Sequence, residues 1–245
     1  MKRVILITGS VSGIGKHLAK SFLDNGDYVI VTGYHDEHIE QTKKELEKYK
    51  ENALYFKIDV NDESSLIKMF EAIKEKFGVL DVLINNAAFD QMESIENYKK
   101  DIFEKIVNTN LIGKMVCIKH SIDLLRKSTY PTIINIASRL ASRPMLNSSA
   151  YCCSAAGIIM LTECAALELA KDNIRVNTVS PSLTITPLSE KSYTNDEMIA
   201  TAQKNPRNRL CEMKDIYNVV NFLISPESDY INGENINVNG GILLK

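Results

Sequence analysis

A glycine-rich stretch near the N-terminus carries residue types suited to binding a phosphate group. The chain reads TGSVSGIG from position 8 to position 15, directly after the apolar run VILI. Phosphate oxygens approach backbone N–H groups closely only where side chains are absent, and a helix N-terminus adds a dipole that favours anions. The spacing of Gly9, Gly13 and Gly15 therefore predicts a dinucleotide-binding loop, with an ordinary turn as the alternative.

Strand-like and helix-like segments alternate around this loop. The first half predicts a strand over 4–8, a helix from Gly13, a strand over 28–32, a charged helix near 40–50, a strand over 54–58 and a helix near 64–77. The second half predicts strands over 82–85, 132–137, 176–180 and 236–238, with helices near 103–126, 151–171 and 216–224 between them. This order is typical of βαβ units.

The strands are apolar without alternation, as expected when helices cover both faces of a sheet. Right-handed crossovers then predict an α/β fold with a doubly wound parallel sheet, Rossmann-like, forming a single domain over 1–245. One long irregular stretch, 182–195, follows the C-terminal end of a strand. We expect a lid over the ligand cleft there rather than a plain surface connection.

Composition excludes several classes of function. The 245 residues are 44% hydrophobic and carry a formal net charge of -2, which gives no general attraction to nucleic acid or to an anionic membrane. We see no apolar run near the roughly 18 residues of a membrane span. The cysteines lack zinc spacing and the histidines lack metal spacing, so we expect no metal, small buried thiols and a reducing cytoplasm. The cysteines are Cys117, Cys152, Cys153, Cys164 and Cys211.

Several further motifs make nearly the whole chain resemble the short-chain dehydrogenase/reductase family. The motifs are the glycine loop, the run NNA at 85–87, Asn110, Ser138 and Tyr151, which opens the stretch YCCSAAG. The resemblance implies an NAD- or NADP-dependent oxidoreductase that transfers a hydride between a nicotinamide and a carbonyl or alcohol substrate. Two departures are Ala88 and Ser182, which stand where the family usually has glycine.

The resemblance also implies a set of cofactor contacts. Asp59 at the end of the third strand matches the family's adenine contact, the NNA run matches a loop that lines the cofactor, and Thr186 matches a residue that touches the nicotinamide amide. The implied cofactor-binding residues are Gly9, Ser12, Gly13, Ile14, Gly15, Asp59, Val60, Asn86, Ala87 and Thr186.

The choice of dinucleotide depends on the end of the second strand. An acid that binds the ribose hydroxyls of NAD is expected about twenty residues beyond the glycines. Gly33 stands there instead, which favours NADP, although Tyr34 and Ser12 supply no cation for its 2′-phosphate. Asp36 and Glu37 lie close by and argue for NAD, so both nucleotides stay open.

The catalytic residues implied by the resemblance are incomplete. Tyr151 is the acid that protonates the developing alkoxide, Ser138 holds the carbonyl, and Asn110 binds a water in a proton relay. Four positions after the tyrosine, where the family has a lysine beside the phenol, this chain has Ala155. A bare phenol has a pKa of about 10. Alcohol oxidation, which starts from the phenolate, should therefore suffer more than ketone reduction.

Three explanations of Ala155 stay open: an enzyme with a slow or unusual relay, a non-catalytic dinucleotide-binding or regulatory relative, and a substitution introduced at this position. A replacement cation from Arg139 or Arg143 is one option, but both are expected at a surface turn.

The substrate is not specified, because its expected contacts lie in the least patterned segments, 89–96, 140–150 and 183–205. By resemblance we expect a homodimer or homotetramer that pairs the helices over 103–126 and 151–171. The apolar residues Ile158, Ile159, Leu161 and Leu167 could equally pack inward.

Overall fold

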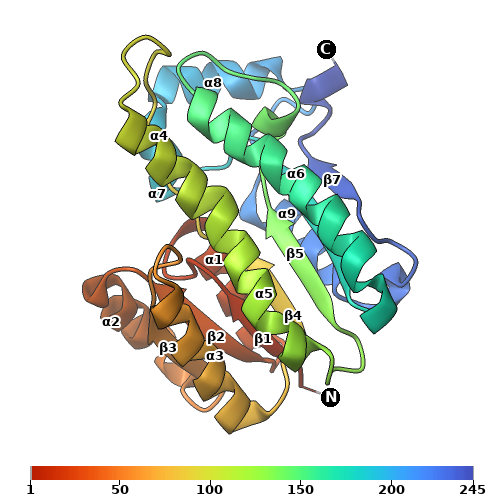
Figure 1. The fold of residues 1–245 in the computed structure, drawn as a ribbon. Coiled ribbons are helices and arrows are strands. Elements are labelled where there is room, and N and C mark those ends of the chain that lie inside the picture. Colours follow the sequence, from red (N-terminus) through yellow and green to blue (C-terminus); the bar gives the residue numbers. More distant parts are fainter. Residues whose placement is uncertain (1, 245) are drawn as a thin grey trace.

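A seven-stranded parallel sheet lies at the centre of the part that the structure describes, residues 2–244, with helices on both faces (Figure 1). The structure is a computed structural model. Its strand order is β3-β2-β1-β4-β5-β6-β7, which places the topological switch between β1 and β4. The strands are β1 (Val4–Ile7), β2 (Tyr28–Gly33), β3 (Ala53–Lys57), β4 (Val82–Asn85), β5 (Thr132–Ile136), β6 (Arg175–Pro181) and β7 (Asn235–Val238). The predicted doubly wound α/β fold is confirmed.

Two apolar layers hold the helices to the sheet. Side chains of α3 (Glu63–Phe77), α5 (Gly113–Leu125) and α6 (Ser149–Leu169) pack on one face. Side chains of α1 (Gly13–Asp24) and α9 (Met213–Leu223) pack on the other. Every residue of β1, β4, β5 and β6 is buried, which explains why these strands show no apolar and polar alternation.

Two helices differ from the sequence expectation. The helix expected near 40–50 begins and ends earlier, as α2 (Asp36–Glu45), and a 3-10 turn over Glu47–Tyr49 follows it. The helix expected over 103–126 is divided into α4 (Lys100–Val107) and α5 by a π-helical turn at Asn108–Ile112. A π-turn inserts one extra residue into the helix and often marks a functional site. Apolar periodicity does not reveal such an insertion.

The expectation that 182–195 is irregular is wrong in its second half. The segment contains α7 (Pro187–Ser192) and leads into α8 (Asn195–Lys204). Both helices begin with a capping box, in which Thr186 pairs with Ser189 and Thr194 pairs with Glu197. A Ser or Thr followed three residues later by Glu is a known helix-start signal, and TNDE at 194–197 matches it.

One helix is long and apolar enough to cross a membrane by length and composition alone, which corrects the sequence expectation. It covers α6 and the turn after it, Ser149–Asp172, with a mean hydropathy of 1.6. Its inward side chains, such as Ala155, Ile158 and Ala165, are buried, and the helix forms part of the layer against the sheet. Its apolar character therefore has an explanation within this fold.

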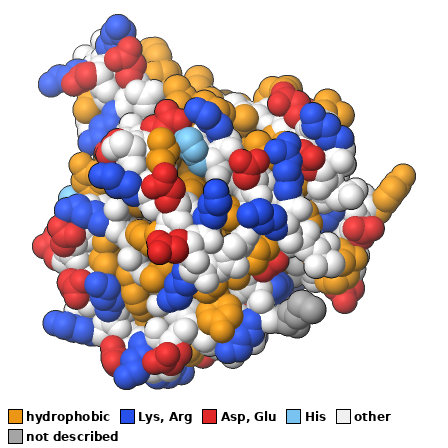
Figure 2. All heavy atoms as spheres, turned by 60° about the horizontal axis from the view of Figure 1, so that its bottom comes forward, with side chains coloured by type: hydrophobic (Ala, Val, Ile, Leu, Met, Phe, Trp, Pro, Cys, Tyr) orange, Lys and Arg blue, Asp and Glu red, His pale blue; other side chains and the backbone are white. Residues whose placement is uncertain are grey.

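The thiols are less uniform than expected. Cys117, Cys152 and Cys211 are buried, but Cys153 and Cys164 are exposed, and all five are free. On the face drawn in Figure 2, basic and acidic side chains are interspersed, with hydrophobic atoms between them. That mixture accords with the small net charge of the chain.

Candidate functional site

The loops after β1 and β4 are tied together at the switch point of the sheet. The Thr8 hydroxyl accepts hydrogen bonds from the backbone N–H groups of Asn86 and Ala87, at 2.9 and 3.0 Å. The Asn86 amide donates back to the carbonyls of Thr8 and Gly9, each at 3.0 Å. These four bonds place the NNA run directly against the glycine loop. In a doubly wound sheet the switch point is where ligands bind.

The close contact between the glycine loop and the loop after β4 requires glycine at several positions. Gly9 and Gly13 have left-handed backbones, with φ of 65° and 52°. A Cβ on Gly15 would lie 2.4 Å from the Gly9 carbonyl oxygen and 2.5 Å from the Asn86 amide nitrogen. Ser12 caps α1 without a side-chain hydrogen bond to it, so the side chain leaves the first-turn N–H groups to an anion. The loop therefore fits the pyrophosphate of a dinucleotide.

The other expected cofactor contacts surround the same edge of the sheet. Asp59, beyond the end of β3, accepts a hydrogen bond from the Asn61 N–H at 2.9 Å, and Val60 packs against Gly113 at the start of α5. Thr186 lies over the glycine loop, since a Cβ on Gly13 would be 3.3 Å from its Cβ and Cγ2 atoms. The segment before α7 thus covers the place expected for the nicotinamide end.

The end of β2 provides no carboxylate for a ribose. A Cβ on Gly33 would lie 2.8 Å from a methyl group of Val11, so a larger residue needs Val11 to move. Tyr34 is 59% exposed. The nearby carboxylate of Asp36 forms an ion pair with Lys57.

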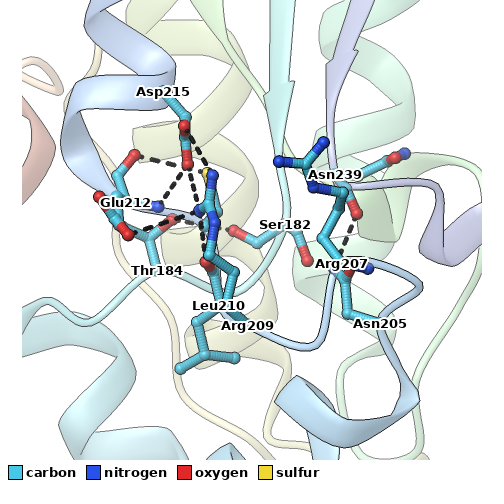
Figure 3. A network of polar contacts seen from close by, with 10 residues as sticks. Ser182, Thr184, Asn205, Arg207, Arg209, Leu210, Glu212, Asp215 and Asn239 are labelled. Carbon is cyan, nitrogen blue, oxygen red and sulfur yellow. Dashed lines mark hydrogen bonds and ion pairs between the residues drawn. The ribbon is translucent and has the colours of Figure 1, made fainter.

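A polar network anchors the segment that covers the glycine loop (Figure 3). Arg209 binds the Asp215 carboxylate with both terminal nitrogens, at 2.6 and 3.0 Å, and Asp215 accepts from the N–H of Glu212 at the start of α9. The Cys211 N–H donates to the Leu183 carbonyl at 3.1 Å. A cavity of about 380 Å³ opens beside this network, between α9 and β7, and none of the predicted site residues lines it.

Ser138 and Tyr151 lie where β5 and α6 approach the switch point. Ser138 follows β5 and caps a 3-10 turn by accepting from the Leu140 N–H at 3.2 Å. Tyr151 is half-buried in the first turn of α6. Burial and the charge of Asp90 raise the pKa of Tyr151 well above its ordinary value, and the Ser138 hydroxyl offsets part of that rise. The phenol therefore stays protonated at neutral pH.

Asn110 is buried in the π-helical turn and clamps the loop after β4. Its side-chain oxygen accepts from the Phe89 N–H at 2.8 Å, and its amide donates to the Phe89 carbonyl at 3.0 Å and to the Ser154 hydroxyl at 3.3 Å. The side chain therefore joins this loop to α6. The family resemblance implies that Asn110 binds a water, and these contacts give it a positioning role as well.

Lys114 was not predicted as a site residue from the sequence, and it is buried beside the site. It is 3% exposed, and its Nζ donates to the carbonyls of Asn85 at 2.9 Å and Ala87 at 3.1 Å. Burial lowers the pKa of Lys114 to about 7, and the thiol of Cys117 opposes this slightly. One signal could have found it: Lys114 follows Asn110 by four residues within a helical region, so both side chains lie on one helix face.

A small cavity of about 10 Å³ joins Lys114 to the catalytic candidates. Its walls come from the loop after β4, the π-turn, α5, the end of β5 and α6. The lining residues include Ala88, Asn110, Lys114, Tyr151, Ser154 and Ala155. Arg139 and Arg143 do not line it. Arg143 is exposed and donates to the Ile242 carbonyl at 3.3 Å.

The three unpatterned segments expected to contact substrate do meet. The Glu93 N–H donates to the Asn147 carbonyl at 2.8 Å, and the Tyr193 hydroxyl contacts the Met145 sulfur at 3.2 Å. Asp90 lies near Tyr151, its Oδ1 atom is buried without a partner among the described residues, and burial raises the pKa of its carboxyl.

The chain is similar to known oxidoreductases over almost its whole length. The family model described as enoyl-(acyl carrier protein) reductase matches residues 9–243. The uncharacterized oxidoreductase YxbG of Bacillus subtilis is 33% identical, over 98% of this chain and 91% of its own length. A 3-oxoacyl-[acyl-carrier-protein] reductase, FabG of Thermotoga maritima, is 30% identical over 99% and 98%. A 3alpha-hydroxysteroid dehydrogenase of Mediterraneibacter gnavus is 31% identical over 97% and 96%.

Solved structures show the same similarity in three dimensions. ElxO with NADP bound has a TM-score of 0.92 at 30% identity, covering 100% of both chains. The aldohexose dehydrogenase of Thermoplasma acidophilum, in ligand-free form, has a TM-score of 0.89 at 28% identity, covering 100% of this chain and 95% of its own. The matched length, the fold and the geometry at the switch point show that this chain belongs to the short-chain dehydrogenase/reductase family of oxidoreductases.

Proposed function

We propose that this chain reduces a carbonyl substrate with a hydride from NADPH or NADH. In this proposal the glycine loop, Asp59, Val60, Asn86, Ala87 and Thr186 hold the dinucleotide, and the nicotinamide supplies the hydride. Ser138 holds the carbonyl oxygen, Tyr151 protonates the alkoxide, and Asn110 keeps the loop after β4 in place. The fit of the glycine loop to a pyrophosphate and the similarity to NADP-bound ElxO support this assignment.

The observation that carries the reductive direction is the environment of Tyr151. Burial and Asp90 hold its pKa above the ordinary phenol value. A neutral phenol can give a proton to an alkoxide but cannot take one from an alcohol. The test is turnover of purified protein with NADPH or NADH and a panel of 3-oxoacyl thioesters, 3-ketosteroids and aldoses. We expect reduction of at least one carbonyl class, abolished by Tyr151→Phe.

Substitution of Ala155 by lysine tests the same difference between ketone reduction and alcohol oxidation. A lysine one helical turn after Tyr151 would bring a cation to the cavity beside the phenol and lower its pKa. We expect Ala155→Lys to raise the rate of alcohol oxidation by about tenfold or more, and the rate of ketone reduction by less. Equal changes in both directions, or an unchanged oxidation rate, would contradict the proposal. Stopped-flow traces of nicotinamide absorbance in each direction give both rates.

We infer a preference for NADP over NAD. Support comes from Gly33, since no carboxylate stands at the end of β2 to repel a 2′-phosphate, and from the Lys57 side chain near Asp36. Titrations that follow nucleotide fluorescence give both dissociation constants. We expect tighter binding of NADPH than of NADH, and a smaller difference for Lys57→Met. Tighter binding of NADH would reverse the assignment.

The non-catalytic alternative makes a different prediction in the same experiments. A dinucleotide-binding or regulatory relative would bind nucleotide tightly and transfer no hydride to any carbonyl of the panel. We also infer a reducing compartment such as the cytoplasm, supported by the five free cysteines, and a homodimer or homotetramer.

A further inference from the structure

We propose that Lys114 supplies, from α5, the cation that position 155 on α6 does not provide, and that it supports Tyr151 across the cavity they share. This inference rests on the proposed function, because Tyr151 is the proton donor there. Lys114 acts through Tyr151 and is therefore a positioning residue. The motif around Tyr151 does not include it, since Lys114 stands 37 positions before Tyr151 on another helix.

The burial of Lys114 is the first observation behind the proposal. An isolated ammonium is costly to remove from water, and buried lysines are normally paired with a carboxylate. The ion pairs among residues 2–244 do not include Lys114, and its Nζ binds only two backbone carbonyls, of Asn85 and Ala87. Burial of the Lys114 ammonium without a counter-ion is unfavourable for the stability of the fold. Groups with such a cost are typical of functional sites.

The remaining hydrogen-bonding capacity of Lys114 is the second observation. An ammonium has three N–H donors, and the two carbonyls account for two of them. The third has no acceptor among the described residues, and Lys114 lines the cavity that Tyr151 and Ala155 also line. The cavity measures about 10 Å³. That volume is close to the roughly 10–15 Å³ that a single water requires.

The proton balance follows from this arrangement. When Tyr151 gives its proton to the alkoxide, a phenolate remains. In the proposed relay the cavity holds one water: the Lys114 ammonium gives one proton to this water, and the water gives one proton to the phenolate. Tyr151 is then a phenol again and Lys114 is a neutral amine, which regains its proton from bulk solvent. No oxidant or reductant takes part in these transfers.

The pKa of Lys114 makes the relay sensitive to pH near neutrality, since it is about 7. The groups that face Lys114 are few. On α5, the Cys117 thiol has a pKa raised to about 12 by burial, so it stays neutral. From the loop after β4 only carbonyls reach it, and α6 contributes Tyr151, whose pKa is raised. Asp90 acts on Tyr151 further along that loop. Lys114 is therefore the residue of this cavity whose titration we expect near pH 7.

The experiment compares the pH profile of kcat for carbonyl reduction in four proteins. They are the wild type, Lys114→Met, the double variant Lys114→Met/Ala155→Lys, and Lys119→Met as the matched control. Lys119 lies on the same helix, is exposed and pairs with Glu63 at 2.8 Å, so it tests the loss of a lysine from α5 outside the cavity.

We expect the wild-type kcat to fall above an apparent pKa of about 7. Lys114→Met should lower kcat by about 10- to 100-fold and remove this dependence, because general acid assistance is lost. Lysine at position 155 in the double variant should restore most of the rate and move the fall to higher pH. Lys119→Met should match the wild type. An unchanged profile in Lys114→Met, or no rescue by lysine at position 155, would overturn the proposal.

A second measurement does not depend on turnover or on the folding of Lys114→Met. In NMR spectra of protein with labelled lysine side chains, one ammonium should titrate near pH 7, and Ala155→Lys should shift that titration by placing a second cation in the same cavity. If Ala155→Lys leaves it unchanged, Lys114 does not face the cavity and the inference fails. If the wild type reduces no carbonyl, the proposed function fails, and this titration alone decides the placement of Lys114.

Discussion

Tyr151 and Lys114 illustrate how burial sets the chemistry of single residues in this protein. Burial disfavours the charged form of each group, so it raises the pKa of the phenol and lowers that of the ammonium. At neutral pH the phenol is therefore neutral, and Lys114 is present partly as the amine and partly as the ammonium. In the proposed relay this ammonium returns a proton to the phenolate that Tyr151 becomes after it protonates the alkoxide. In solvent the phenol would also be neutral at pH 7, but the lysine would stay an ammonium.

The buried Lys114 also predicts a pH dependence of stability. Its folded-state pKa is about 7, below the ordinary 10.5, so between these values the unfolded chain binds more protons than the folded chain. Stability attributable to this group therefore rises with pH in that window, and the full cost of burial is present below pH 7. Between pH 7 and pH 9 the wild type should gain about 2–3 kcal/mol relative to Lys114→Met.

Urea unfolding of both proteins at several pH values measures this difference. Lys114→Met also leaves the carbonyls of Asn85 and Ala87 without their donor, which changes its stability by an amount that does not depend on pH. Only the change with pH is therefore diagnostic. Parallel curves for the two proteins would show that the pKa of Lys114 is not lowered in the folded protein.

The segment from Ser182 to α7 is the element whose position decides access to the glycine loop. Thr186 lies on Gly13, and the capping box at Thr186 fixes the start of α7. At its other end, the Leu183 carbonyl is held by the Cys211 N–H, next to the Arg209 and Asp215 pair. The segment is thus fixed at its base and at the start of α7, and we expect α7 to be held more firmly when a ligand lies beneath it.

Hydrogen exchange tests this description of α7. We expect NADPH to slow exchange of the amides in Pro187–Ser192 by about tenfold, equivalent to about 1.4 kcal/mol of local opening free energy, because the nucleotide fills the space beneath the helix. Amides of α3, which packs on the sheet away from the glycine loop, serve as the internal reference. Equal protection in both helices would indicate a global effect, and no protection of α7 would contradict its role as a cover.

At the scale of the whole molecule, α6 presents an apolar stripe to solvent. Met160 and Leu167 are 58% and 81% exposed, and Cys153, Ala156 and Cys164 lie on the same side at helical spacing. Of the residues named from the sequence, Ile158 packs inward, whereas Leu167 does not. Exposed apolar surface of this kind is typical of a protein interface. It supports the proposed homo-oligomer, with α6 against the same helix of another copy.

Light scattering coupled to size-exclusion chromatography tests that assembly. We expect the wild type to elute as a dimer or tetramer, and the double variant Met160→Glu/Leu167→Glu to elute at a lower mass because like charges would meet across the interface. Ile199→Glu is the control, since Ile199 is 55% exposed on α8. A wild-type monomer, or a double variant of unchanged mass, would exclude this stripe as the interface.

Local chemistry allowed much of this protein to be predicted from its sequence. The strands β1, β4 and β5 are mostly apolar and show no alternation, and the glycines stand where a phosphate-binding turn needs them. Both features could therefore be recognised from the sequence alone. The sequence also indicated which residue to look for beside Tyr151, because a helix places residues four positions apart on one face. From this spacing and the family resemblance, Ala155 was predicted to leave the phenol without a neighbouring lysine.

Only the tertiary structure decided what lies beside that phenol. Lys114 stands just after the π-turn, and the loop after β4 presents two carbonyls to its ammonium beside the site. Likewise, the covering helix α7 is short and polar, so its position over Gly13 depends on contacts with distant parts of the chain. Burial, and with it the pKa of each group, is set by neighbours that are remote in sequence, which no local pattern records.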